Sequence, residues 1–150
     1  MDNWYLVAIG SNRVGARARV AAALPNAMHC SRTITSRPIG PGTRDYANAT
    51  VMIESDLSPD DLLRNLKAIE RAAGRRPGRR WGDRPLDLDI IGWGGGIWAS
   101  SALTIPHPEF RKREFVLAPI VEIAPDWRDP VTHLTARQLL ARLDRKRRRA

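Results

Sequence analysis

Residues 80–90 read RWGDRPLDLDI, and the last five of them alternate apolar residues with aspartate. Successive side chains of a β-strand point to opposite faces, so Asp87 and Asp89 would share one face while the apolar side chains occupy the other. Mg²⁺ is typically held by one or two carboxylates together with water and substrate phosphates, and this pair meets that requirement. The plain alternative is an amphipathic edge strand with a solvated acidic face.

Five arginines shortly precede this strand, namely Arg75, Arg76, Arg79, Arg80 and Arg84. Glycine and proline interrupt the run, so it cannot form a regular helix and is expected to be a loop. A cationic loop beside an anionic strand face suits a substrate that is a metal-bound polyphosphate.

The chain has 150 residues, the size of one domain that can bury a proper core. Its single cysteine, Cys30, excludes an intramolecular disulfide and a thiolate-rich zinc site, and we expect it to be a small packed residue. No apolar run approaches the roughly 18 to 20 residues of a membrane span, and the N-terminus does not resemble a signal peptide. We therefore expect a cytoplasmic protein that does not bind membranes.

More than half of the formal net charge of +9 lies at the C-terminus. Residues 142–150, RLDRKRRRA, carry six basic groups and one acidic group. A terminal run of like charge is commonly a frayed, solvated end, and a contact with RNA or a membrane is the open alternative. We divide the chain into a single domain over residues 1–141 and a basic tail over residues 142–150.

The clearest helix signal begins at Ser58, which precedes Pro59 and two acidic residues. Serine is a good N-cap, proline suits the first helical position, and acids stabilise the positive end of the helix dipole. The core stripe would be Leu62, Leu63, Leu66 and Ile69, and the helix would end at about Ala73.

The remaining patterns predict strands over residues 4–9 and 46–54, a β-prone segment at 33–35, and an arginine-faced helix over about 13–24. The glycine cluster at 92–96 predicts a hairpin, 115–123 is an apolar segment, and Thr135 would cap a last helix through Leu143. The order strand, helix, strand, strand, helix, strand indicates an α+β fold. Its core would be ferredoxin-like βαββαβ, an antiparallel sheet flanked by helices, with a C-terminal helical extension.

Three blocks together resemble the 6-hydroxymethyl-7,8-dihydropterin pyrophosphokinases of folate biosynthesis. Residues 80–90 resemble the family signature R-x-G-P-R-x-x-D-L-D-I, and residues 103–108, LTIPHP, with Arg111, Arg113 and Phe115, resemble its second block. Residues 37–41, RPIGP, followed by Tyr46 and Asn48, look like its pterin loop. The resemblance runs from Ile9 to about Pro125.

The resemblance implies transfer of the β,γ-pyrophosphoryl group of MgATP to the pterin hydroxymethyl oxygen, with release of AMP. Such a transfer depends on alignment and charge neutralisation, which metal ions and arginines supply. The implied cofactors are two Mg²⁺ ions held by Asp87 and Asp89, with ATP as co-substrate. The implied partners are ATP and the pterin, without nucleic acid, and we expect a monomer.

The same resemblance assigns residues to roles. The implied catalytic residues are Arg75, Arg84, Asp87 and Asp89. Those implied in ATP binding are Glu70, Arg75, Arg84, Ile90, Thr104, His107 and Arg113. Those implied in pterin binding are Ser36, Pro38, Ile39, Tyr46, Asn48, Trp81, Asp87 and Phe115. Without the resemblance, Tyr46 and Phe115 would be core aromatics and His107 a turn residue.

Four positions depart from the family pattern: Asp83 replaces a proline, Ala102 a basic residue and Lys67 an amide, and Pro77 disturbs the arginine loop. They bear on nucleotide affinity more than on the reaction. Two other classes stay open. An RNA-binding module shares the element order, but the aromatic signature of such sheets is absent. An inactive homologue would have lost site residues that this chain retains.

Overall fold

The computed structural model describes residues 3–11, 27–32, 34–36, 46–73 and 86–149, and all statements on structure concern these residues. The helix expected over 13–24, the loop at 37–45 and the arginine loop over 74–85 lie outside them.

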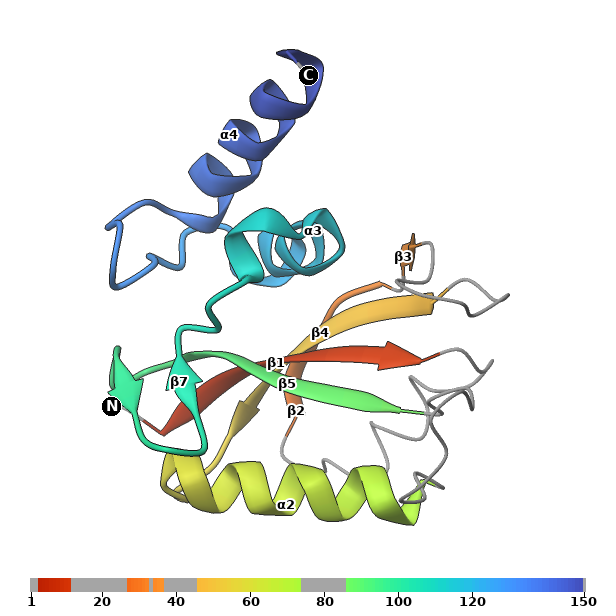
Figure 1. Cartoon of the computed structure of the whole chain (residues 1–150), viewed down its shortest axis with the longest axis vertical. Helices are drawn as coiled ribbons and strands as arrows, with labels where there is room; N and C mark the ends of the chain where they lie inside the picture. The colour runs from red at the N-terminus through yellow and green to blue at the C-terminus, as the bar shows by residue number, and fades with distance from the viewer. Residues whose placement is uncertain (1–2, 12–26, 33, 37–45, 74–85, 150) are drawn as a thin grey trace.

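The fold is built on an antiparallel sheet in which β1, Trp4–Ser11, is a central strand (Figure 1). It pairs with β4, Tyr46–Glu54, on one side and with β5, Asp87–Trp93, on the other. Two short strands, β2 over Ala27–Cys30 and β3 over Ile34–Ser36, both pair with β4. The order β2-β4-β1-β5 is that of a ferredoxin-like sheet, which confirms the predicted fold class.

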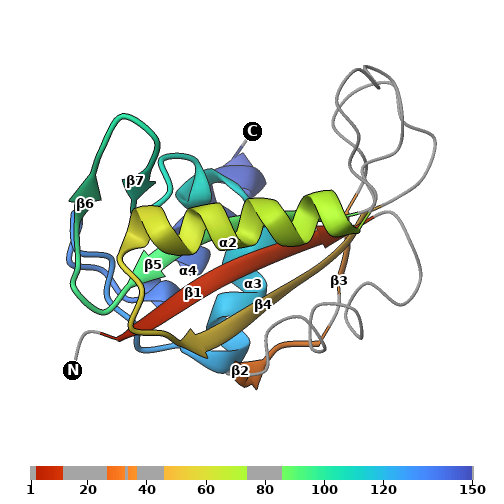
Figure 2. The same ribbon diagram turned by 90° about the horizontal axis from the view of Figure 1, so that it is seen from below.

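Helix α2, Pro59–Ala72, covers one face of the sheet (Figure 2). The Ser58 hydroxyl accepts a hydrogen bond from the Asp61 N–H at 3.3 Å, as the N-cap prediction requires. Leu62 and Leu66 are buried against the sheet, and Leu63 and Ile69 pack at the margin of that core. The predicted core stripe of this helix is therefore confirmed.

The opposite face of the sheet, which we call the α3 face, is covered by the C-terminal third of the chain. Helix α3, Glu114–Ile123, packs on it together with the short 3-10 helix Phe110–Lys112 (Figure 1). Leu6 and Ile91 of the sheet meet Leu117 and Ile120 of the helix in this second core. Sequence periodicity predicted a C-terminal extension but not where it would pack.

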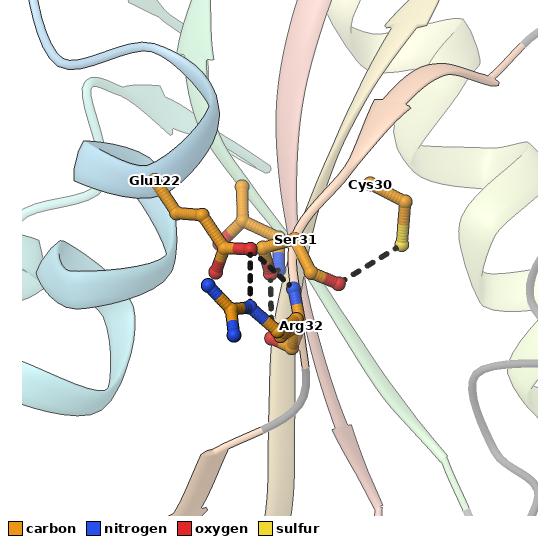
Figure 3. A network of polar contacts seen from close by, with 5 residues as sticks. Cys30, Ser31, Arg32 and Glu122 are labelled. Atoms are coloured by element: carbon orange, nitrogen blue, oxygen red, sulfur yellow. Dashed lines mark hydrogen bonds and ion pairs between the residues drawn. The ribbon is translucent and has the colours of Figure 1, made fainter.

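Figure 3 shows how the edge strand β2 is joined to α3. The Glu122 carboxylate accepts hydrogen bonds from the Arg32 N–H at 3.0 Å and from Arg32 Nε at 3.3 Å. The Ser31 hydroxyl accepts from the Thr50 N–H of β4 at 2.9 Å and donates to the Arg32 carbonyl at 2.9 Å. Cys30 is exposed, so the expectation that it would be a packed residue is wrong.

The hairpin predicted at the glycine cluster lies further along the chain. Strand β6, Trp98–Ala99, pairs with β7, Thr104–Ile105, in a separate two-stranded sheet rather than with β5. Gly96 has a φ of 95°, which favours glycine, and a Cβ at Gly95 would lie 2.4 Å from the Trp93 ring. The glycines therefore turn the chain tightly past Trp93 instead of continuing the sheet.

The last helix, α4, spans Ala136–Arg149 and begins as predicted at Thr135. Thr135 and Gln138 exchange main-chain to side-chain hydrogen bonds of 2.9 and 3.2 Å, a capping box. The helix continues beyond Leu143, its expected end, so the basic residues 142–149 are helical. Arginine and lysine favour a helix and its C-terminal end, and Arg147 forms an ion pair with Glu114 of α3.

Among the described residues, no helix is long and apolar enough to cross a bilayer.

Candidate active site

Strand β5 carries Asp87 and Asp89 onto the α3 face of the sheet. Their neighbours Leu88 and Ile90 are buried in the core beneath α2, as the alternation in the sequence predicted. Asp87 lies opposite Gly10 of β1, and Asp89 lies opposite Ala8. Both carboxylates are half-buried, so they can be reached from solvent while part of their hydration is lost.

The strand register brings Asn48 into the same row as Asp87. Asn48 of β4 lies opposite Gly10, which in turn lies opposite Asp87, so an amide and a carboxylate flank a residue without a side chain. Asn48 is 7% exposed. An amide and a carboxylate on one face can together hydrogen-bond both donors and acceptors along the edge of a flat ligand.

Several charges meet around Asp89. Burial raises the pKa of Asp89 above its ordinary value, and the negative charge of Asp87 raises it further. The charge of His107 in its protonated form and the charges of Lys67 and Arg113 act in the opposite direction. The two carboxylates are therefore close enough to repel each other, and a divalent cation would relieve that repulsion.

This charge pattern fits a magnesium site that is completed by substrate. In the described part of the chain, no group of three or more histidine, cysteine, aspartate or glutamate side chains could enclose a metal ion. Asp87 and Asp89 would hold the ion, and water and phosphate oxygens would supply the remaining ligands, which is the arrangement that Mg²⁺ prefers.

His107 lies in the segment that follows β7, and its main chain is tied to β5. Its N–H donates to the Ile91 carbonyl at 3.1 Å, and its Nδ1 accepts from the Glu109 N–H at 3.1 Å. Burial lowers the pKa of His107, although the negative charge of Asp89 opposes that shift. The neutral ring, with Nδ1 as acceptor, carries its proton on Nε2 and can donate it to a phosphate oxygen.

The start of α3 carries Arg113, whose charge acts on Asp89, and Phe115. Arg113 is the N-cap residue of α3, and its guanidinium carbon lies 5.9 Å from the centre of the Phe115 ring. Phe115 packs partly against the core of the α3 face and remains half-exposed. A half-exposed ring under a guanidinium can stack on a planar ligand, so a core role and a binding role are compatible here.

Glu70 and Lys67 approach the site from α2, at the free edge of β5. Glu70 is 1% exposed, and its Oε1 accepts a hydrogen bond from the Leu88 N–H at 3.1 Å. Its Oε2 lies 3.7 Å from the Lys67 ammonium nitrogen. Lys67 was noted only as a departure from the family pattern. Its position one turn before Glu70 on the same helix is the signal that could have placed it near the site.

Among the described residues, the structure does not bring the other predicted site residues together around the two aspartates. The Ile90 side chain is buried in the α2 core, so only its main chain could contact a nucleotide. Thr104 is exposed on β7. Ser36 and Tyr46 are described only as strand residues of β3 and β4. Five more residues, Arg75, Arg84, Pro38, Ile39 and Trp81, lie outside the described ranges.

The chain is similar to several known proteins. It is 46% identical over 115 residues to the 2-amino-4-hydroxy-6-hydroxymethyldihydropteridine pyrophosphokinase of Synechocystis sp., a match that covers 77% of this chain and 59% of that relative. It is 43% identical over 129 residues to the enzyme of the same name from Haemophilus influenzae, covering 80% of this chain and 81% of the relative. It is 37% identical over 154 residues to the enzyme of the same name from Methylorubrum extorquens, covering 96% of this chain and 95% of that relative.

A solved structure shows the same fold at low sequence identity. The Plasmodium falciparum HPPK-DHPS with pteroate aligns with a TM-score of 0.75 and 12% identity, covering 95% of this chain and 42% of that chain. A family model described as 7,8-dihydro-6-hydroxymethylpterin-pyrophosphokinase (HPPK) matches residues 6–125. These matches, with relatives at 37–46% identity, show that the chain belongs to the 7,8-dihydro-6-hydroxymethylpterin-pyrophosphokinase family.

Proposed function

We propose that this protein transfers the β,γ-pyrophosphoryl group of MgATP to the hydroxymethyl oxygen of 6-hydroxymethyl-7,8-dihydropterin, yielding AMP and the pterin diphosphate, a step of folate biosynthesis. The observation that carries this proposal is the half-buried pair Asp87 and Asp89, in which Asp87 lies in one row with Gly10 and Asn48 on the same face of the sheet. Membership of the pyrophosphokinase family supports the same reaction.

The Asp pair would hold two Mg²⁺ ions, which would supply positive charge to neutralise the phosphates during transfer. His107 would donate its Nε2 proton to a phosphate oxygen, and Arg113 would add a permanent positive charge on the same side. Arg75 and Arg84 would clamp the phosphates bidentately, a geometry that lysine cannot reproduce.

The pterin would lie over the row formed by Asn48, Gly10 and Asp87. Asn48 would pair with the polar edge of the ring, and the absence of a side chain at Gly10 would leave room for a flat molecule. Phe115 would stack on the ring from α3, and Tyr46 and Trp81 would complete the stacking surfaces. The hydroxymethyl group would then point along the sheet toward Asp89 and the phosphates.

Product analysis tests this proposal. ATP and Mg²⁺ are incubated with the protein, with and without 6-hydroxymethyl-7,8-dihydropterin, and the nucleotides are separated. We expect AMP to form only when the pterin is present. ADP as the main product would indicate an ordinary kinase. If a folded sample consumes no nucleotide, the chain is an inactive homologue.

A further inference from the structure

The C-terminal half of α4 carries a stripe of positive charge that the proposed reaction does not use. The residues at i, i+3, i+4 and i+7, namely Arg142, Arg145, Lys146 and Arg149, line an open hollow of about 230 Å³. Positions with this spacing share one helix face. At 1.5 Å rise per residue the stripe is roughly 10 Å long. We call these four residues the α4 stripe.

The charges of the α4 stripe are available to a ligand. Within the described chain, none of the four forms an ion pair or a hydrogen bond from its side chain, whereas the neighbouring Arg147 pairs with Glu114. Asp144 is the one acidic residue on this part of the helix. Residues 142–149 therefore keep a net charge of +5 on about two turns of helix.

The apolar side of α4 is already occupied. Leu139 is buried in the core of the α3 face, and Leu140 and Leu143 pack against it. A helix that lies in a membrane interface needs a free apolar face to insert between lipids. Because α4 has none to spare, the stripe is better suited to a polyanion in water than to a lipid surface.

The α4 stripe is also separate from the candidate active site and from the residues that the family model matches. Helix α4 extends away from the sheet beyond α3, while Asp87 and Asp89 lie on the sheet itself (Figure 1). The family model ends at Pro125, before α4 begins. The stripe thus lies outside the part of the chain that the family model matches, and the pterin and ATP contacts proposed above do not use it.

We propose that the α4 stripe binds the phosphate backbone of a nucleic acid without sequence preference. One strand of a nucleic acid presents a phosphate about every 3.4 Å along its axis, so a stripe of roughly 10 Å meets about three phosphates. Three of the four side chains are arginines, whose guanidinium groups can hold phosphate oxygens bidentately. The stripe includes no aromatic residue on which bases could stack, which is why no base preference is expected.

The test is a titration of fluorescein-labelled oligouridine and of a mixed-sequence oligonucleotide of equal length with the full chain. Fluorescence anisotropy is recorded at several salt concentrations. We expect both oligonucleotides to bind equally well. The slope of log K against log salt should be about −2, which corresponds to about three phosphates neutralised on a single strand.

Two variants of equal charge give the proposal its control. Replacing all four residues of the α4 stripe by alanine should weaken binding at least tenfold and flatten the salt slope, while circular dichroism shows an intact fold. Replacing four exposed cations elsewhere, Arg32, Arg64, Arg71 and Lys112, should change binding less than threefold. Equal weakening in both variants would show that net charge, not the stripe, governs binding.

Two further results would overturn the proposal. One is the absence of any binding by the wild-type chain at low salt. The other is binding to vesicles that contain an anionic lipid, abolished in the stripe variant, with no binding to either oligonucleotide.

Discussion

The carboxylate of Glu70 accepts a hydrogen bond from the main-chain N–H of Leu88, at 3.1 Å, although the two residues lie on different elements. Leu88 stands between Asp87 and Asp89, and its N–H points to the free edge of β5. Because β5 is the outermost strand of the sheet among the described residues, a buried helix carboxylate here takes the place of a neighbouring strand and fixes the segment that carries both site aspartates.

Glu70→Ala should therefore lower the free energy of unfolding more than Glu70→Gln does. Alanine leaves the buried Leu88 N–H without an acceptor, at a cost of about 1–3 kcal/mol in the free energy of unfolding. Glutamine keeps an acceptor oxygen and loses the charge that faces Lys67. Urea denaturation of the three proteins measures the difference. Equal stability of the two variants would show that the hydrogen bond to Leu88 contributes nothing.

Asp89→Asn should reduce turnover by at least about a hundredfold, because it removes half of the carboxylate pair. The same change should stabilise the fold at neutral pH. Because the folded-state pKa of Asp89 is raised, the folded protein binds its proton more tightly than the unfolded chain does. Wild-type stability therefore falls as pH rises from 3.8, the ordinary value, through the raised folded pKa.

Thermal denaturation of the wild type and Asp89→Asn across that pH range measures this effect. The gap in melting temperature should be largest near pH 7 and should close in acid. A variant that is less stable than the wild type at pH 7 would contradict the electrostatic cost assigned to Asp89.

Asp129 should affect the pH dependence of stability in the opposite direction to Asp89, because its pKa is lowered. Burial alone would raise its pKa, but hydrogen bonds from Arg111, Val131 and Thr132 outweigh this and lower it. Arg111 binds both carboxylate oxygens, at 2.5 and 2.8 Å, and Asp129 is fully buried. Breaking such a buried pair typically costs about 3–5 kcal/mol, so Asp129→Ala should be severely destabilised.

The pH dependence of Asp129 has the sign of a lowered pKa. The contribution of Asp129 to folding stability is fully present above its unfolded-state pKa of 3.8, and it is lost as the pH falls through the lower pKa of the folded state. Acid unfolding followed by circular dichroism should lose part of its pH dependence in Asp129→Asn. An unchanged acid transition in that variant would contradict the assignment.

Thr50→Val is expected to stabilise the protein by about 1 kcal/mol, because it removes a buried polar atom and keeps the shape of the side chain. The Thr50 hydroxyl is buried and has no hydrogen-bond partner among the described residues. Thr50→Ser is the matched control: it keeps the hydroxyl, loses a methyl group and should be destabilised. Chemical denaturation that ranks serine above valine would sink this interpretation.

Local patterns in the sequence were sufficient for β4, β5 and α2. Alternation placed Asp87 and Asp89 on one face, and the Ser58 cap with its leucine stripe defined the helix. Strand β2 was not predicted, because its four side chains are all exposed and its position depends on main-chain pairing with β4. Exposed residues carry no apolar periodicity from which a strand could be inferred.

The parts of the site that depend on local sequence spacing could be predicted, and the parts that depend on strand pairing and helix packing could not. The spacing of the aspartates can be read from the chain, but the row of Asn48, Gly10 and Asp87 depends on the register between three strands. The arrival of Arg113 and Phe115 depends on α3 packing across the sheet, a tertiary contact that no short pattern encodes. Helical spacing places Lys67 one turn before Glu70, but the effect of its charge on Asp89 depends on how α2 packs beside β5.

The most direct measurement follows the β-phosphorus of ATP. The protein is incubated with Mg²⁺, pterin and ATP radiolabelled in the β-phosphate, with Asp89→Asn as the control, and the products are separated. Transfer of a pyrophosphoryl group moves the label from the nucleotide to the pterin and leaves unlabelled AMP, and the variant should show almost none of it. Label that remains in ADP, with none in the pterin, would contradict pyrophosphoryl transfer.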